Sequence, residues 1–90
     1  LQDYAAAAPH LVQLQSIGRS HEGRDIWLVA LTNQATGDHA DKPAIWVDGN
    51  IHAAELTAST ACLYWLHALV SGHGRDREAT QLLDPRTVYI

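Results

Sequence analysis

The residues of this chain best suited to chemistry are His52 and Glu55, which lie three positions apart. They belong to the stretch 48–55, where an apolar run that reads as a strand ends and a helical pattern begins. In α/β sheets, ligands collect at the carboxyl ends of strands. At the start of a helix, this spacing lets an imidazole nitrogen and a carboxylate oxygen point at one metal ion. Zinc accepts that mixture of donors.

The same pair also has a purely structural interpretation. A His-x-x-Glu motif is short and arises easily by chance, and a glutamate near a helix N-terminus is favoured by the helix dipole. A hydrolytic zinc site needs three protein ligands and an open position for water. Asp48 could orient His52 by a hydrogen bond, or it could serve only the strand. Spacing alone leaves these interpretations open.

The rest of the chain predicts the element order α-β-β-β-α-α-β. Gly23 is expected in a turn at positive φ, between two strands of a hairpin. The third strand is an apolar run that predicts burial on both faces, and the long helix after it is expected to be buried on more than one side. The predicted elements are a helix over 4–8 capped by Asp3, strands over 11–17, 25–31 and 44–48, a surface loop over 32–42, helices over 56–70 and 76–83, and a strand from residue 87.

Several aromatic, histidine and cysteine side chains are assigned structural roles. The lone cysteine, Cys62, lies in a helical apolar run and is expected to be a buried thiol without a disulfide. His67 is expected at the core or its rim. Trp27, Trp46 and Trp65 are expected in the core, and His10, His21, His39 and His73 on exposed loops or turns.

Composition excludes two classes of partner. The net charge is −4 and the six basic residues are scattered, which argues against a nucleic-acid partner. The longest apolar stretch, 58–70, is too short to span a membrane. With 47% hydrophobic residues, the 90-residue chain can form a packed core. Because the chain lacks methionine and stops inside the apolar strand 87–90, we expect the domain to continue beyond Ile90.

Three blocks in order carry a family resemblance. They are residues 16–26, with Ile-Gly-Arg-Ser-His-Glu-Gly-Arg at their centre, the strand 42–48, and Gly-Asn-Ile-His-Ala-Ala-Glu at 49–55. Together they resemble the zinc carboxypeptidases of the carboxypeptidase A/B type, and the resemblance covers nearly the whole chain. It implies that residues 1–90 are the N-terminal portion of a zinc carboxypeptidase-like catalytic domain.

The resemblance implies an α/β fold of phosphorylase/hydrolase-like architecture, with a mixed β-sheet between helices. It implies Zn²⁺ held by His52 and Glu55, with a third ligand, a histidine, and a glutamate general base both downstream of Ile90. The implied activity is zinc-dependent hydrolysis of a C-terminal peptide bond, in which zinc activates water and polarises the carbonyl. The 90 residues alone are expected to be inactive.

One position departs from the family pattern. Carboxypeptidases A and B have an arginine directly before the ligand glutamate, where this chain has Ala54. In those enzymes this arginine helps to bind the substrate, so the resemblance does not extend to A/B-type substrate binding. The expected partner is a peptide or acyl-amino-acid substrate. Two alternatives stay open: a zinc amidase or deacylase on the same scaffold, and a non-catalytic zinc- or peptide-binding module. The resemblance favours a secreted or periplasmic location, whereas side-chain preference and oligomeric state do not follow from the sequence.

Overall fold

A computed structural model describes residues 1–90 and has the predicted element order. The loop before the third strand contains two short 3-10 turns, which the sequence did not predict. None of the helices is long and apolar enough to cross a membrane. The elements are α1 (Gln2–Ala7), β1 (Val12–Arg19), β2 (Asp25–Leu31), η1 (Gln34–Thr36), η2 (His39–Asp41), β3 (Ala44–Trp46), α2 (Leu56–Gly72), α3 (Arg77–Leu83) and β4 (Thr87–Tyr89).

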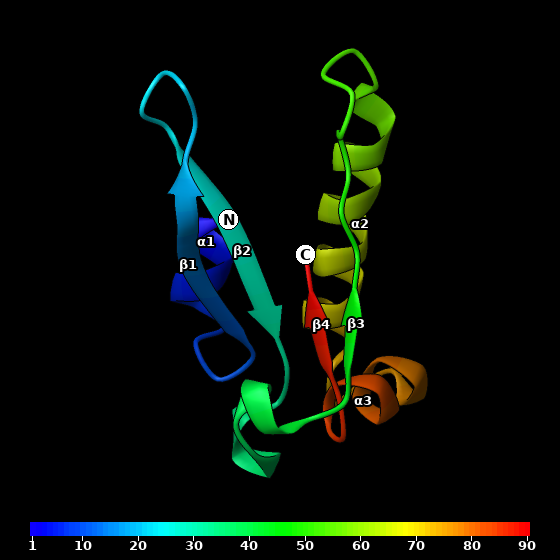
Figure 1. Ribbon diagram of the computed structural model, residues 1–90. Helices are drawn as coiled ribbons and strands as arrows, with labels where there is room; N and C mark the ends of the chain where they lie inside the picture. The colour runs from blue at the N-terminus through cyan, green and yellow to red at the C-terminus, as the bar shows by residue number, and fades with distance from the viewer.

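The four strands form one mixed sheet, which confirms the predicted fold class. Their spatial order is β1-β2-β4-β3, so the last strand of the chain lies between the second and the third. β1 and β2 are antiparallel, β4 is antiparallel to β2, and β3 is parallel to β4. Figure 1 shows the β1–β2 hairpin diverging from β3, β4 and α2 above the point where β2 meets β4.

The three helices share one hydrophobic core with one face of the sheet. Leu31 of β2 and Val88 of β4 are neighbours across the ladder and are fully buried. They pack in one cluster with Leu66 of α2 and Leu83 of α3, and Ala8 brings the end of α1 into it. Alternate strand residues point to the same face, so this cluster fixes which face of each strand meets the helices.

The hairpin turn has the predicted conformation. Gly23 has a φ of 78°, a left-handed value that favours glycine. Its N–H donates to the Ser20 carbonyl over 2.9 Å, and the Arg24 N–H donates to Ser20 Oγ. The two strands then pair from Arg19–Asp25 to Val12–Leu31. The β1–β2 hairpin turn is therefore stabilised by local interactions, namely the left-handed Gly23 and the hydrogen bonds to Ser20.

The predicted burial of β3 and α2 is wrong for this chain. β3 is an edge strand whose three residues are exposed, with Trp46 at 59%. On α2 only Leu66 and Leu69 are buried, whereas Tyr64 is 73% exposed. An apolar run predicts that a strand or helix is covered, but it does not show which chain segment covers it.

Several side-chain placements also differ from the predictions. α1 begins two residues earlier than predicted, so Asp3 lies in its first turn and makes no cap hydrogen bond. Trp27 is exposed and Trp65 is half-buried, so none of the three tryptophans is a core residue. His67 is exposed and hydrogen-bonded to the Tyr4 hydroxyl over 2.9 Å. His10 and His21 are exposed as expected.

A polar cluster connects the loop after β2 to the turn before β4. Asp84 Oδ1 accepts a hydrogen bond from Asn33 Nδ2 over 2.8 Å, and His73 Nε2 lies 3.0 Å from it. Lys42 Nζ donates to Thr32 Oγ1 and to the Asn33 carbonyl. His73 is therefore half-buried and bonded, contrary to its predicted exposure. The side-chain hydrogen bond from Asn33, and then that from His73, hold the pKa of Asp84 below its ordinary value.

This cluster predicts an acid-sensitive contribution to stability. A carboxyl whose folded-state pKa is depressed stabilises the fold above its unfolded pKa, and that contribution is lost as pH falls through the folded-state pKa. We expect Asp84→Asn to unfold at lower urea concentration than the wild type at neutral pH. The difference should shrink below about pH 4. The measurement is urea unfolding at several pH values, with exposed Asp41→Asn as the control. A wild-type advantage that is unchanged at low pH would contradict it.

Candidate metal centre

The site lies where β3 ends and α2 begins. Beyond β3, Val47 still follows β4, because its N–H donates to the Tyr89 carbonyl over 2.8 Å. The chain then turns at Asn50, whose φ of 68° is the only positive value at a non-glycine residue. Glu55 is the N-cap residue of α2. The carboxyl end of a parallel strand thus leads through a short loop into a helix, which is where ligands bind in α/β sheets.

The structure brings His52 and Glu55 together, as their spacing predicted. The Glu55 N–H donates to the His52 carbonyl over 3.0 Å, which closes a turn. In this turn, His52 Nδ1 lies 3.1 Å from Glu55 Oε2. The two side chains are 76% and 65% exposed. A single exposed pair of this kind adds little to stability, so the fold does not depend on it.

The geometry of the pair fits two zinc ligands. Two donors each about 2.1 Å from a tetrahedral ion lie about 3.4 Å from each other. The observed separation of 3.1 Å between an imidazole nitrogen and a carboxylate oxygen is close to that value. No group of three histidine, cysteine or acidic side chains gathers anywhere in the chain. These residues can therefore supply two of the three protein ligands that a hydrolytic zinc site needs.

Asp48 does not orient the His52 ring in this structure. No hydrogen bond joins the two residues, and the His52 ring nitrogen that is bonded faces Glu55. Asp48 instead lies at the edge of an apolar cleft, beside Gly49. Because β3 ends at Trp46, Asp48 also lies outside the strand, so the structure supports neither of the two roles predicted for it.

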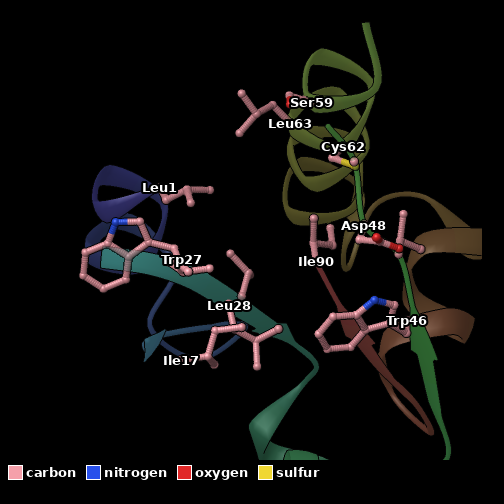
Figure 2. A pocket seen from close by; sticks show the side chains of 14 residues that line it. Leu1, Ile17, Trp27, Leu28, Trp46, Asp48, Ser59, Cys62, Leu63 and Ile90 are labelled. Atoms are coloured by element: carbon pink, nitrogen blue, oxygen red, sulfur yellow. The ribbon is translucent and has the colours of Figure 1, made fainter. Parts of the chain in front are cut away.

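The apolar cleft, of about 370 Å³, was not predicted. It adjoins the loop between β3 and α2 that carries His52 and Glu55. Figure 2 shows Leu28 of β2 on one side, Cys62 and Leu63 of α2 on the other, and Ile90 between them, whereas the Trp27 ring is directed away from α2. Cys62 is thus half-buried on the cleft wall and not a buried core thiol. The cleft arises because β2 diverges from α2, a tertiary feature with no signal in local sequence.

Comparison with known proteins assigns the chain. The model of the zinc carboxypeptidase family matches residues 1–90, the full chain. The chain belongs to the zinc carboxypeptidase family. This confirms the resemblance carried by the three sequence blocks.

Relatives of this chain include both A-type and B-type carboxypeptidases. Carboxypeptidase A2 of Mus musculus is 33% identical over 90 residues, which cover 100% of this chain and 20% of that protein. Carboxypeptidase B of Homo sapiens is 32% identical over 89 residues, covering 99% and 20%. A zinc carboxypeptidase of Saccharothrix mutabilis subsp. capreolus is 30% identical over 82 residues, covering 91% and 19%.

Solved structures show the same fold. Thrombin activatable fibrinolysis inhibitor matches with a TM-score of 0.87 at 25% identity, over 99% of this chain and 21% of that one. Carboxypeptidase A of Helicoverpa armigera matches with a TM-score of 0.81 at 26% identity, over 99% and 20%. The chain therefore spans about a fifth of the length of the relatives it matches.

The exposure of the candidate ligands predicts a contrast in stability. Because His52 is exposed, His52→Ala should change the free energy of unfolding by less than about 1 kcal/mol. Leu66 is fully buried in the α2 core, so Leu66→Ala should cost about 2–5 kcal/mol. Urea unfolding without added metal measures both. A loss in His52→Ala as large as that in Leu66→Ala would show that the loop is a structural element.

Proposed function

We propose that residues 1–90 are the N-terminal part of a zinc-dependent carboxypeptidase domain, in which His52 and Glu55 are two of the metal ligands. The observation that carries the proposal is the 3.1 Å approach of His52 Nδ1 to Glu55 Oε2. It occurs in a chain that matches the zinc carboxypeptidase family over its full length. The proposed reaction is hydrolysis of the C-terminal peptide bond of a peptide substrate.

Bound zinc would supply an activated water and a polarised scissile carbonyl. The residues of this chain have a more limited task, which is to hold two donors at a fixed spacing. His52 would bind through Nδ1, the nitrogen that faces the carboxylate, which leaves Nε2–H free to donate elsewhere. Glu55 would act as a ligand, since its Oε2 lies beside His52 Nδ1, and the family resemblance implies that another glutamate is the general base. The third ligand and the base would come from residues outside this chain.

Ala54 supports keeping one alternative on the same scaffold. The position directly before Glu55 carries an exposed alanine, which offers no charge to a substrate carboxylate. A zinc amidase or deacylase acting on an acyl-amino acid would use the same two ligands. It would differ in the groups that grip the substrate, which lie outside these residues. A non-catalytic zinc- or peptide-binding module would keep the loop but lack the third ligand or the base.

The ligand assignment predicts a specific loss of zinc binding. Zn²⁺ added to the wild-type chain should shift the NMR signals of the His52 ring before those of the other histidines. His52→Ala and Glu55→Gln should each weaken zinc binding by about tenfold or more, since one of two donors is removed. The matched control is His21→Ala, because His21 is exposed in the hairpin turn. Equal zinc affinity in His21→Ala and His52→Ala would place the metal elsewhere.

The missing ligand and base predict an inactive chain. The purified 90 residues with Zn²⁺ should release no C-terminal residue from a blocked dipeptide. The reason is that two ligands and no base do not make a hydrolytic site. The measurement is chromatographic detection of the released amino acid. Hydrolysis that requires zinc and disappears in His52→Ala would overturn the assignment of the base to residues outside this chain.

A further inference from the structure

The loop that carries His52 and Glu55 begins beside the start of α2, because Gly49 lies against the backbone of that helix. A Cβ placed on Gly49 would lie 2.9 Å from the carbonyl carbon of Ala58, 3.0 Å from its oxygen and 3.1 Å from the Ser59 nitrogen. These are backbone atoms in the first turns of α2, so no side-chain rotation relieves the clash. Any larger residue at position 49 must push the end of β3 away from α2. Gly49 therefore sets the distance between the end of β3 and the start of α2, the two elements that the loop connects.

The next residue, Asn50, sets the direction of the chain after Gly49. Asn50 has a left-handed backbone with a φ of 68°, which asparagine tolerates better than other non-glycine residues. Its Oδ1 is buried and has no hydrogen-bond partner. The side chain therefore gains no hydrogen bond at Oδ1, and the backbone conformation is the feature that favours asparagine here. Only Ile51 separates Asn50 from His52, so a change in this backbone rotates the imidazole directly.

Glu55 lies at the other end of the loop, at the start of α2. It is the N-cap residue of α2, so its position follows the helix, whereas His52 follows the end of β3. The 3.1 Å separation of their donor atoms arises within the turn that the Glu55 N–H and the His52 carbonyl close, and the chain enters this turn from the end of β3 through Gly49 and Asn50. Neither Gly49 nor Asn50 has a hydrogen bond to the two donors. Their influence passes only through the backbone.

We propose that Gly49 and Asn50 are positioning residues of the metal centre, which hold His52 Nδ1 and Glu55 Oε2 at the spacing that one zinc ion requires. The proposal rests on the proposed zinc function and adds residues that the His-x-x-Glu pattern does not contain. Gly49 acts through its close contact with α2, and Asn50 acts through its left-handed backbone. Replacing either should lower metal affinity without touching a donor atom.

The test compares four variants of the 90-residue chain. Gly49→Ala adds a Cβ that clashes with the backbone of Ala58 and Ser59. Asn50→Ala disfavours the left-handed backbone. Asn50→Gly keeps that backbone and should rescue it. Gly72→Ala is the matched control, because its Cβ would also be crowded, at 3.1 Å from Ala79 Cβ and 3.2 Å from Asp76 Cβ, but at the far end of α2.

Three readouts separate positioning from general destabilisation. They are the Zn²⁺ affinity followed at the His52 ring by NMR, the hydrogen exchange of the Glu55 amide, which is bonded to the His52 carbonyl, and the melting temperature. We expect Gly49→Ala to weaken zinc binding by about tenfold, the lower end of the range for residues that support ligands. Asn50→Ala should act in the same direction, and Asn50→Gly should stay within about twofold of the wild type. Glu55 exchange should accelerate in Gly49→Ala but not in Gly72→Ala.

The outcomes distinguish this proposal from the zinc proposal on which it rests. Wild-type zinc affinity and unchanged Glu55 exchange in Gly49→Ala would overturn the positioning role. So would losses in Gly49→Ala that are matched by Gly72→Ala at equal melting temperature. If the wild-type His52 ring does not respond to Zn²⁺, the ligand assignment fails. Glu55 exchange in the metal-free variants then decides the positioning role alone.

Discussion

The pairing of β4 with two other strands at once holds the two halves of this chain together. β4 joins the N-terminal hairpin through Ala30–Tyr89 and Leu31–Val88, and it joins β3 through three parallel pairs. Val88 is fully buried at the centre of this arrangement and packs in the cluster that includes Leu66 of α2. Without β4, β3 would have no neighbour in the sheet. The loop that carries His52 would then project from an unsupported strand.

Local chemistry accounts for the parts of the fold that the sequence predicts. β2 has the predicted bounds, because Gly23 supplies a left-handed turn before it and a continuous apolar run forms it. The predicted start of α3 is confirmed to within one residue, since Asp76 caps it by accepting from the Ala79 N–H. The insertion of β4 between β2 and β3 could not be predicted in this way. It joins residues more than forty positions apart, and periodicity carries no information about such pairing.

Burial follows a similar division. The apolar run of β3 correctly indicates a strand, but it gives no indication that Trp46 would be exposed in these residues. Burial depends on what lies against a strand, and the chain spans about a fifth of its relatives. The Asp84 cluster could not be predicted either, because it depends on contacts between segments that are distant in the sequence. Asn33, His73 and Asp84 are polar residues from three separate segments, and each alone reads as an ordinary loop or cap residue.

The candidate metal centre was predictable where it is local. His52 and Glu55 meet because three residues separate them in a single turn before a helix, and their spacing in the sequence carries that information. The close contact of Gly49 with the backbone of α2 is tertiary, so sequence spacing could not reveal it. The apolar cleft beside the loop is tertiary as well. Sequence therefore indicates the candidate donors, and structure shows the tertiary contacts of the loop that carries them.

The most direct test of the account is a crystal structure of the chain soaked in Zn²⁺, with the metal located by anomalous scattering at the zinc edge. The account predicts one principal zinc peak, about 2.0–2.2 Å from both His52 Nδ1 and a carboxylate oxygen of Glu55. A principal peak at another histidine, or one bound by His52 without Glu55, would contradict it.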